Sequence, residues 1–165
     1  MPEPEFPKSF DESEPRRANG RLLSLDLGTK RVGVAVSDEL QVSVKPLTPL
    51  GRTNWKALLR QIQDLQHSFD AQAVVIGLPL KLDGTEGDAA VEARRIARNL
   101  SLSLDVPVYL QDERLTSHAA TESLRDAGVS GSELTARLDS EAAALILRDF
   151  ISHRENQAED EQPKN

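Results

Sequence analysis

The 165-residue chain has no cysteine and only three histidines, one tryptophan and one tyrosine. Without cysteine, a disulfide framework, a thiolate metal site and a cysteine nucleophile are all excluded. The histidines are scattered, at positions 67, 118 and 153, which argues against a zinc site with ordinary histidine ligands. Any metal that the chain binds would therefore be a hard cation held by carboxylate oxygens.

Long apolar runs are also missing. No stretch reaches the roughly 18 apolar residues that a membrane-spanning helix needs, so we expect no membrane association. The N-terminal segment MPEPEFPKSFDESEP is acidic and has no apolar stretch, which excludes a secretory signal and a transit peptide. The absence of cysteine is compatible with a cytoplasmic protein but does not prove it.

The net charge of −7 is a mild argument against a nucleic-acid-binding protein. The argument weakens when the charge is divided along the chain. Residues 21–151 carry 18 acidic and 15 basic side chains, a net charge of −3. If some of these acids bind divalent cations, the working domain is close to neutral.

Length and composition predict one domain with a tail at each end. Residues 1–20 are rich in Pro, Glu, Asp and Ser, and we expect a disordered leader. Residues 153–165 have a similar composition, and we expect a disordered tail. The folded domain should span residues 21–152.

The apolar pattern predicts an α/β domain in which a strand meander is followed by alternating helices and strands. Prolines place the third and fifth strands near sheet edges, and the third should be short. The whole order implies a five-stranded mixed sheet with helices packed on it. The expected strands are 21–27, 31–37, 41–50, 73–77 and 106–111, and the expected helices are 53–69, 89–103, 116–127 and 132–151.

Two groups of acidic residues occur where predicted strands end. Asp26 stands near the end of an apolar strand, just before Gly28 and Thr29, where it could equally cap the turn. Asp112 and Glu113 follow the 106–111 strand, and the ends of strands are where α/β sheets place their sites. Two solvated charges on a connector would explain that pair as well, and the residues do not decide between Asp112 and Glu113.

Asp139 is the most informative acidic position. At about 100° per residue it lies at the centre of the apolar stripe of the last helix. A carboxylate that faces a sheet is costly unless it is paired or binds metal. Asp139 is therefore a site candidate, and a buried salt bridge to an arginine such as Arg114 is the alternative. The stripe consists of Ala142, Ala143, Ile146 and Phe150.

Three carboxylates without cysteine or clustered histidine suit Mg²⁺ or Mn²⁺. Such a site can cleave phosphodiester bonds by activating water and stabilising the leaving oxygen. We expect Lys30, Arg31, Arg114 and Thr116 to contact substrate, the cations through phosphate oxygens. For Lys30 and Arg31, a solvated hairpin turn is nearly as good an explanation.

Four segments in order resemble the YqgF/RuvX family of pre-16S rRNA nucleases, which are related to Holliday junction resolvases. They are LDLGTKRVGVAVSD (25–38), VVIGLPLKLDGTEG (74–87), DERLTS (112–117) and DSEAAALIL (139–147), so the resemblance covers roughly 21–151. It implies an RNase H-like fold and acidic catalytic and metal-binding positions at Asp26, Glu113 and Asp139. It also implies cytoplasmic trimming of the 5′ end of small-subunit precursor rRNA.

Other functions stay open at this point. Cleavage of a DNA junction would use the same residues. An ATP-binding phosphotransferase is suggested by LDLGTK, which resembles the first phosphate loop of sugar kinases, although 165 residues are too few for the two domains of those enzymes. A non-catalytic RNA-binding module is disfavoured, because idle carboxylates would repel phosphate.

Overall fold

The computed structural model describes residues 19–114 and 131–160, and in the second range it describes the side chains of 140–156. The centre of the domain is a five-stranded sheet in the order β3-β2-β1-β4-β5. Strands β1, β2 and β3 form an antiparallel meander, whereas β4 and β5 run parallel to β1. The strands are β1 (Leu22–Leu27), β2 (Arg31–Ser37), β3 (Val44–Gly51), β4 (Ala73–Leu78) and β5 (Val108–Asp112). The predicted mixed sheet is confirmed.

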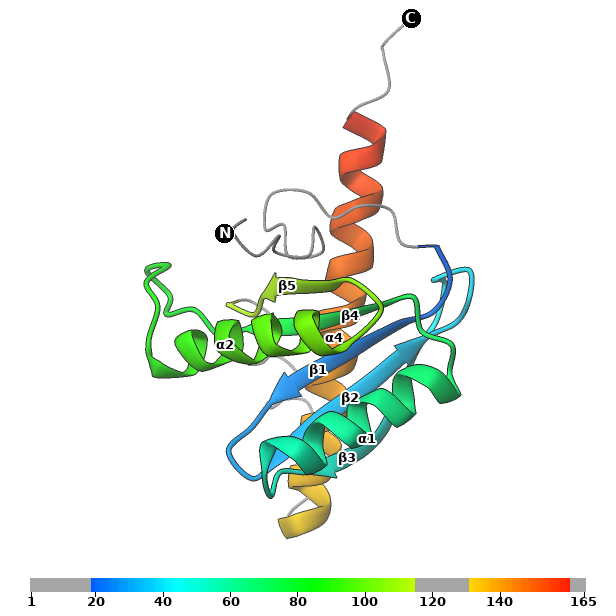
Figure 1. Cartoon of the computed structure of the whole chain (residues 1–165). Coiled ribbons are helices and arrows are strands. Elements are labelled where there is room, and N and C mark those ends of the chain that lie inside the picture. Colours follow the sequence, from blue (N-terminus) through cyan, green and yellow to red (C-terminus); the bar gives the residue numbers. More distant parts are fainter. Residues whose placement is uncertain (1–18, 115–130, 161–165) are drawn as a thin grey trace, which may run out of the picture.

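Helices cover both faces of this sheet (Figure 1). On one face lie α1 (Trp55–Ser68) and α2 (Asp88–Ser103), and on the other lies α4 (Gly131–Asp160). Asn54 caps α1, since its side chain accepts a hydrogen bond from the backbone N–H of Ala57 at 2.9 Å. None of the helices in the described ranges combines the length and the apolar content that crossing a bilayer requires.

The domain has two apolar cores, one on each face of the sheet, and successive side chains of β1 point alternately into one and the other. Leu23 and Leu25 pack under α1 and α2, whereas Leu22 belongs to the core under α4. Ser24, on the same side as Leu22, donates a hydrogen bond to the carbonyl of Ala143 in α4 at 2.7 Å. Because side chains alternate with a period of two, Asp26 also belongs to the α4 face. Strand β4 is buried along its whole length, as its continuous apolar sequence predicts.

Helix α4 crosses the strands one after another, from β3 to β5. Ser140 donates to the carbonyl of Leu47 in β3 at 2.5 Å, and Ala143 meets β1 through Ser24. Three residues later, Ile146 lies against Gly77 in β4. One more turn brings Phe150 to Tyr109 in β5, with ring centroids 5.4 Å apart. Helix α4 therefore crosses the face of the sheet toward which the Asp26 side chain points.

Two expectations differ from the structure. Strand β3 is at the sheet edge, as predicted, but it has 8 residues rather than a short run. Its prolines are tolerated because an edge strand needs ladder hydrogen bonds on one side only. Helix α4 continues through Asp160, so residues 153–160, expected in a disordered tail, are helical. They contain no Gly or Pro to end the helix. The expected helix 116–127 and leader residues 1–18 lie outside the described residues.

Candidate active site

The structure brings Asp26 and Glu113 together at the carboxyl ends of their strands. Asp26 is the second-last residue of β1, Glu113 directly follows β5, and β4 lies between those strands. The Glu113 N–H donates to the carbonyl of Leu78 at 3.1 Å, so the pairing with β4 continues one residue past β5. The two carboxyl groups are hydrogen-bonded to each other. Two acids from distant parts of the sequence therefore lie together at the end of the sheet where β1, β4 and β5 have their carboxyl ends.

Alternation explains why Glu113, and not Asp112, turns toward Asp26. On β5, Tyr109 contacts α4 through Phe150, and the Gln111 amide lies 3.0 Å from the imidazole of His153. Glu113 is the next position in this period of two, so its side chain points to the α4 face. Asp26 points to the same face from β1.

Gly77 leaves the space that the Glu113 side chain occupies. A Cβ at Gly77 would lie 1.9 Å from Oε1 of Glu113 and 2.6 Å from Cδ1 of Ile146. Any side chain at this point of β4 would therefore displace the carboxyl group. Glycine in a strand is typical of such a close approach.

Burial and mutual proximity change the protonation of the pair. Burial raises the pKa of Asp26, and the hydrogen bond from Glu113 opposes that rise. Burial and the neighbouring Asp26 charge raise the pKa of Glu113 to about 9. At neutral pH, Glu113 therefore carries the proton and donates a hydrogen bond to the Asp26 carboxylate. Displacing that proton would leave two adjacent, half-buried carboxylates, which is an arrangement that binds a hard divalent cation.

Asp112 serves a different purpose, because its side chain holds Arg114. Its carboxylate accepts hydrogen bonds from the Arg114 backbone N–H at 2.9 Å and from Nε at 2.8 Å. Partial burial raises the pKa of Asp112, but the hydrogen bonds and charge of Arg114 outweigh that effect, so the pKa is lowered. The guanidinium lies beside the 78–87 loop, since a Cβ at Gly84 would be 3.1 Å from Nη1 of Arg114. Asp112 thus fixes the direction of a cation beside the loop that follows β4.

Asp139 lies in α4, one turn before Ala143, but its side chain is outside the described part of the chain. Of the predicted stripe, Ala143, Ile146 and Phe150 are buried against the sheet, whereas Ala142 is half-buried. The buried face also includes Ala144 and Leu147, so it is turned partly away from the side on which Asp139 was predicted. Among the side chains that are described, no three acidic or histidine residues gather into a metal-binding cluster. The role of Asp139 as a third ligand stays a prediction.

The other predicted contacts lie near the same end of the sheet or outside the described residues. Lys30 is exposed in the turn after β1, and its carbonyl accepts from the Arg52 N–H at 3.0 Å. Arg31 is half-buried at the start of β2. Thr116 falls outside the described residues.

Sequence reasoning missed the roles of Gly77 and Asp112. A glycine that ends an apolar run was a usable signal for close approach at Gly77. The two-residue spacing of Asp112 and Arg114 gave no comparable signal, because such pairs are common on solvated connectors.

Comparison with known proteins identifies the family. Residues 20–153 match the family model described as "RuvX: Holliday junction resolvase". The chain belongs to this family. A relative from Anaeromyxobacter sp. (strain K) is 40% identical over 134 residues, 81% of this chain and 98% of that protein. One from Myxococcus xanthus is 42% identical over 135 residues, 81% of this chain and 89% of that protein. Both carry the name "Putative pre-16S rRNA nuclease", so the resemblance seen in the sequence motifs is confirmed.

Solved structures with a similar arrangement of strands and helices support the RNase H-like fold. The yeast mitochondrial Holliday junction resolvase Ydc2 matches with a TM-score of 0.51 at 13% identity, covering 88% of this chain and 86% of that one. RuvC of T. thermophilus, solved with a Holliday junction substrate, matches with a TM-score of 0.50 at 15% identity, covering 83% and 97%. At these identities the likeness concerns the fold alone.

Proposed function

We propose that this RuvX-family chain is a divalent-metal-dependent nuclease that trims the 5′ end of precursor 16S rRNA in the cytoplasm. The observation that carries the proposal is the hydrogen-bonded pair Asp26 and Glu113 at the carboxyl ends of β1 and β5. The names of the relatives from Anaeromyxobacter and Myxococcus supply the substrate. Family membership makes hydrolysis of phosphodiester bonds the reaction.

The donor set fits Mg²⁺ or Mn²⁺. Asp26 and Glu113 offer only oxygen atoms, which hard cations prefer. The raised pKa of Glu113 reflects an electrostatic demand for a positive charge that a cation can satisfy in place of the proton. These two residues would hold the metal together with Asp139, the proposed third ligand. A cation bound there supplies an activated water and stabilises charge on the phosphate oxygens.

The remaining residues position the substrate. Arg114, one residue after Glu113 and held by Asp112, keeps part of its side chain exposed and can bind a phosphate. Lys30 and Arg31, in and after the turn that follows β1, can bind a neighbouring phosphate. Thr116 completes the proposed set of contacts.

Analysis of rRNA in a strain depleted of this protein tests the proposal. Small-subunit rRNA with extended 5′ ends should accumulate on depletion. Wild-type protein should restore the mature end, whereas Asp26→Asn protein made in equal amount should not. Correctly trimmed 5′ ends in the depleted strain would contradict the proposed substrate.

A DNA junction is the second candidate substrate, and the description of the family favours it. Purified protein with Mn²⁺ can be given the precursor RNA and a four-way DNA junction in parallel. Cleavage of the junction alone would replace RNA by DNA in the proposal. If the protein binds RNA but cleaves neither the precursor RNA nor the DNA junction, it would be a non-catalytic binding module.

A further inference from the structure

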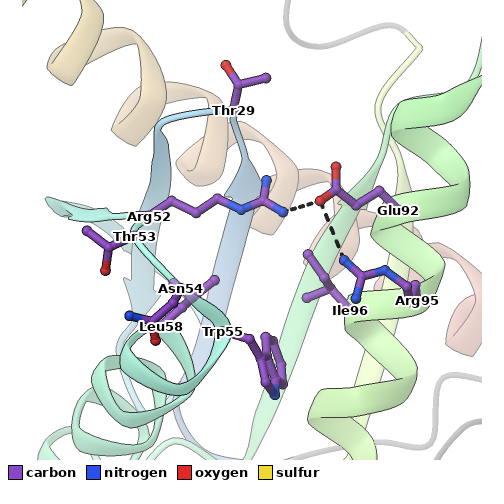
Figure 2. A pocket seen from close by; sticks show the side chains of 9 residues that line it. All are labelled: Thr29, Arg52, Thr53, Asn54, Trp55, Leu58, Glu92, Arg95 and Ile96. Carbon is purple, nitrogen blue, oxygen red and sulfur yellow. Dashed lines mark hydrogen bonds and ion pairs between the residues drawn. The ribbon is translucent and has the colours of Figure 1, made fainter.

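A cavity lies on the opposite face of the sheet from α4, between the start of α1 and the first turns of α2. Its volume is about 440 Å³, which is within the range of roughly 300–1,000 Å³ that small-molecule sites have. Figure 2 shows its residues reaching in from both helices and from the loop before α1. The lining consists of Thr29, Arg52, Thr53, Asn54, Trp55, Leu58, Glu92, Arg95 and Ile96.

The cavity is joined to the end of the sheet that carries the acidic pair. Arg52 Nη1 donates to the carbonyl of Gly28 at 2.8 Å, and Gly28 is two residues after Asp26. Thr29, at the mouth of the cavity, belongs to the same turn. A nucleic-acid strand that is bound at Asp26 and passes over this end of the sheet can therefore reach the cavity.

The chemistry of the lining suits one nucleotide. Leu58 and Ile96 are buried and form an apolar floor, and Trp55 offers an indole on which a base can stack. Glu92 pairs with Arg52 and, at 3.7 Å, with Arg95, as the dashed lines of Figure 2 show. The Arg95 side chain is 61% exposed. It can therefore turn from this long ion pair to a phosphate, which an arginine binds more specifically.

We infer that this cavity binds one nucleotide of a single-stranded RNA, with its base against Trp55 and its phosphate on Arg95. The choice of RNA rests on the proposed function. The cavity thus gives the nuclease a subsite away from the reacting bond, on the α1 and α2 face of the sheet.

Trp55 is the sole tryptophan of the sequence, so its fluorescence reports on this cavity alone. The full-length protein in EDTA, which prevents cleavage, is titrated with a short single-stranded oligoribonucleotide. Binding is followed in parallel by anisotropy of the labelled oligonucleotide. Saturable quenching of Trp55 at the concentrations where anisotropy rises supports the inference. Unchanged Trp55 emission while anisotropy reports binding overturns it and leaves the proposed nuclease function intact.

Two substitutions in the cavity, with one control outside it, refine the test. The logarithm of the binding constant falls linearly with the logarithm of the salt concentration, and Arg95→Ala should make this slope less steep by about 0.7. That is the value for one phosphate contact on a single strand. Arg98→Ala, one turn later on α2 and outside the cavity, is the matched control and should change the slope less. Trp55→Leu should weaken binding by roughly tenfold or more, with melting temperature recorded to confirm folding. Equal slopes for the two arginine variants, or unchanged affinity of folded Trp55→Leu, would contradict the inference.

The source of the nucleotide is decided by a comparison with AMP. A site for an RNA strand should bind the oligoribonucleotide much more tightly than AMP, because neighbouring phosphates add contacts outside the cavity. Equal affinities would mean a site for free nucleotides and would overturn the assignment to RNA. Metal-dependent cleavage, assayed separately, reports on the proposed function independently of Trp55.

Discussion

Among single residues, Gly77 controls the position of Glu113 most directly. A methyl group at Gly77 would overlap Oε1 of Glu113 and Cδ1 of Ile146. Gly77→Ala should therefore move the Glu113 carboxyl group and reduce cleavage by roughly 100-fold, the effect of a misplacement of about 1 Å. Overpacking of about 1–3 kcal/mol should also lower the melting temperature by several degrees.

Gly51 provides the matched control for this substitution. It also lies in a strand, but a Cβ there would meet nothing within 4 Å. Gly51→Ala should therefore retain wild-type cleavage and nearly wild-type stability. If Gly77→Ala cleaved RNA as fast as Gly51→Ala, the position of Glu113 over Gly77 would not matter to the reaction.

At the scale of elements, the register of α4 predicts the consequence of Asp139→Asn. One turn after Asp139, Ala143 is fixed to β1 by the Ser24 hydrogen bond, and Ser24 lies two residues before Asp26 on the same face of the sheet. Asn keeps the shape but loses the charge. We expect cleavage to be abolished and the melting temperature to be equal or higher, since repulsion between carboxylates is relieved.

A salt-bridge role for Asp139 predicts the opposite result. Asn would then leave a buried arginine without its partner and destabilise the protein by roughly 3–5 kcal/mol. Thermal unfolding and Mn²⁺-dependent cleavage measured on the same variant distinguish the two roles. A destabilised but active protein would remove Asp139 from the metal site.

The C-terminal turns of α4 give a second prediction at this scale. Arg154 lies over the ring of Phe150, with 5.4 Å between the guanidinium carbon and the ring centroid, and donates to Gln41 at 3.4 Å. Glu155 and Asn156 are exposed. A chain of residues 19–156 should keep the wild-type melting temperature and activity. A chain ending at His153, which keeps the contact of that residue with Gln111, should melt a few degrees lower, because the Arg154 contacts contribute about 1 kcal/mol.

Equal melting temperatures of the two truncated chains would show that Arg154 contributes nothing measurable. A loss of stability or activity in the 19–156 chain would show instead that a terminal segment docks on the domain. The full-length protein, purified in the same way, is the reference for both.

At the scale of the whole molecule, much of the fold follows from local pattern. The hairpin at Gly28, the apolar run of β4 and the stripe of α4 each depend on residues close in sequence. The pairing of Asp26 with Glu113 does not. It requires β5 to add beside β4 and both side chains to share the α4 face, which depends on contacts between distant segments. Near the end of β5, the sequence alone left Asp112 and Glu113 equivalent, and only the family resemblance chose between them.

The acidic pair also predicts how global stability depends on pH in the absence of metal. The pKa of Glu113 is raised to about 9 in the folded protein, whereas the unfolded chain has the ordinary glutamate value of 4.5. Between these values the folded protein keeps a proton that the unfolded chain has lost, so the free energy of unfolding falls as pH rises through this window. Relative to Glu113→Gln, the wild type in EDTA should lose roughly 5 °C or more in melting temperature between about pH 6 and pH 9.

Magnesium or manganese should oppose this loss, since a cation replaces the proton. The stabilisation by metal should therefore be larger at about pH 9 than at pH 6. It should be small in Glu113→Gln at both pH values. Parallel pH profiles of wild type and variant would show that the pair is not protonated as the structure indicates.

We propose that Asp26 and Glu113 form the metal site of an RNA-cleaving enzyme. The most direct test is cleavage of a 5′-extended 16S precursor RNA by the purified protein, with Mn²⁺ and with EDTA, beside Asp26→Asn, Glu113→Gln and the exposed control Glu155→Gln. We predict that wild type and Glu155→Gln cleave only with the metal and that both site variants are at least 100-fold slower, because each loses one ligand. Metal-dependent cleavage at the wild-type rate by Asp26→Asn or Glu113→Gln would contradict the account.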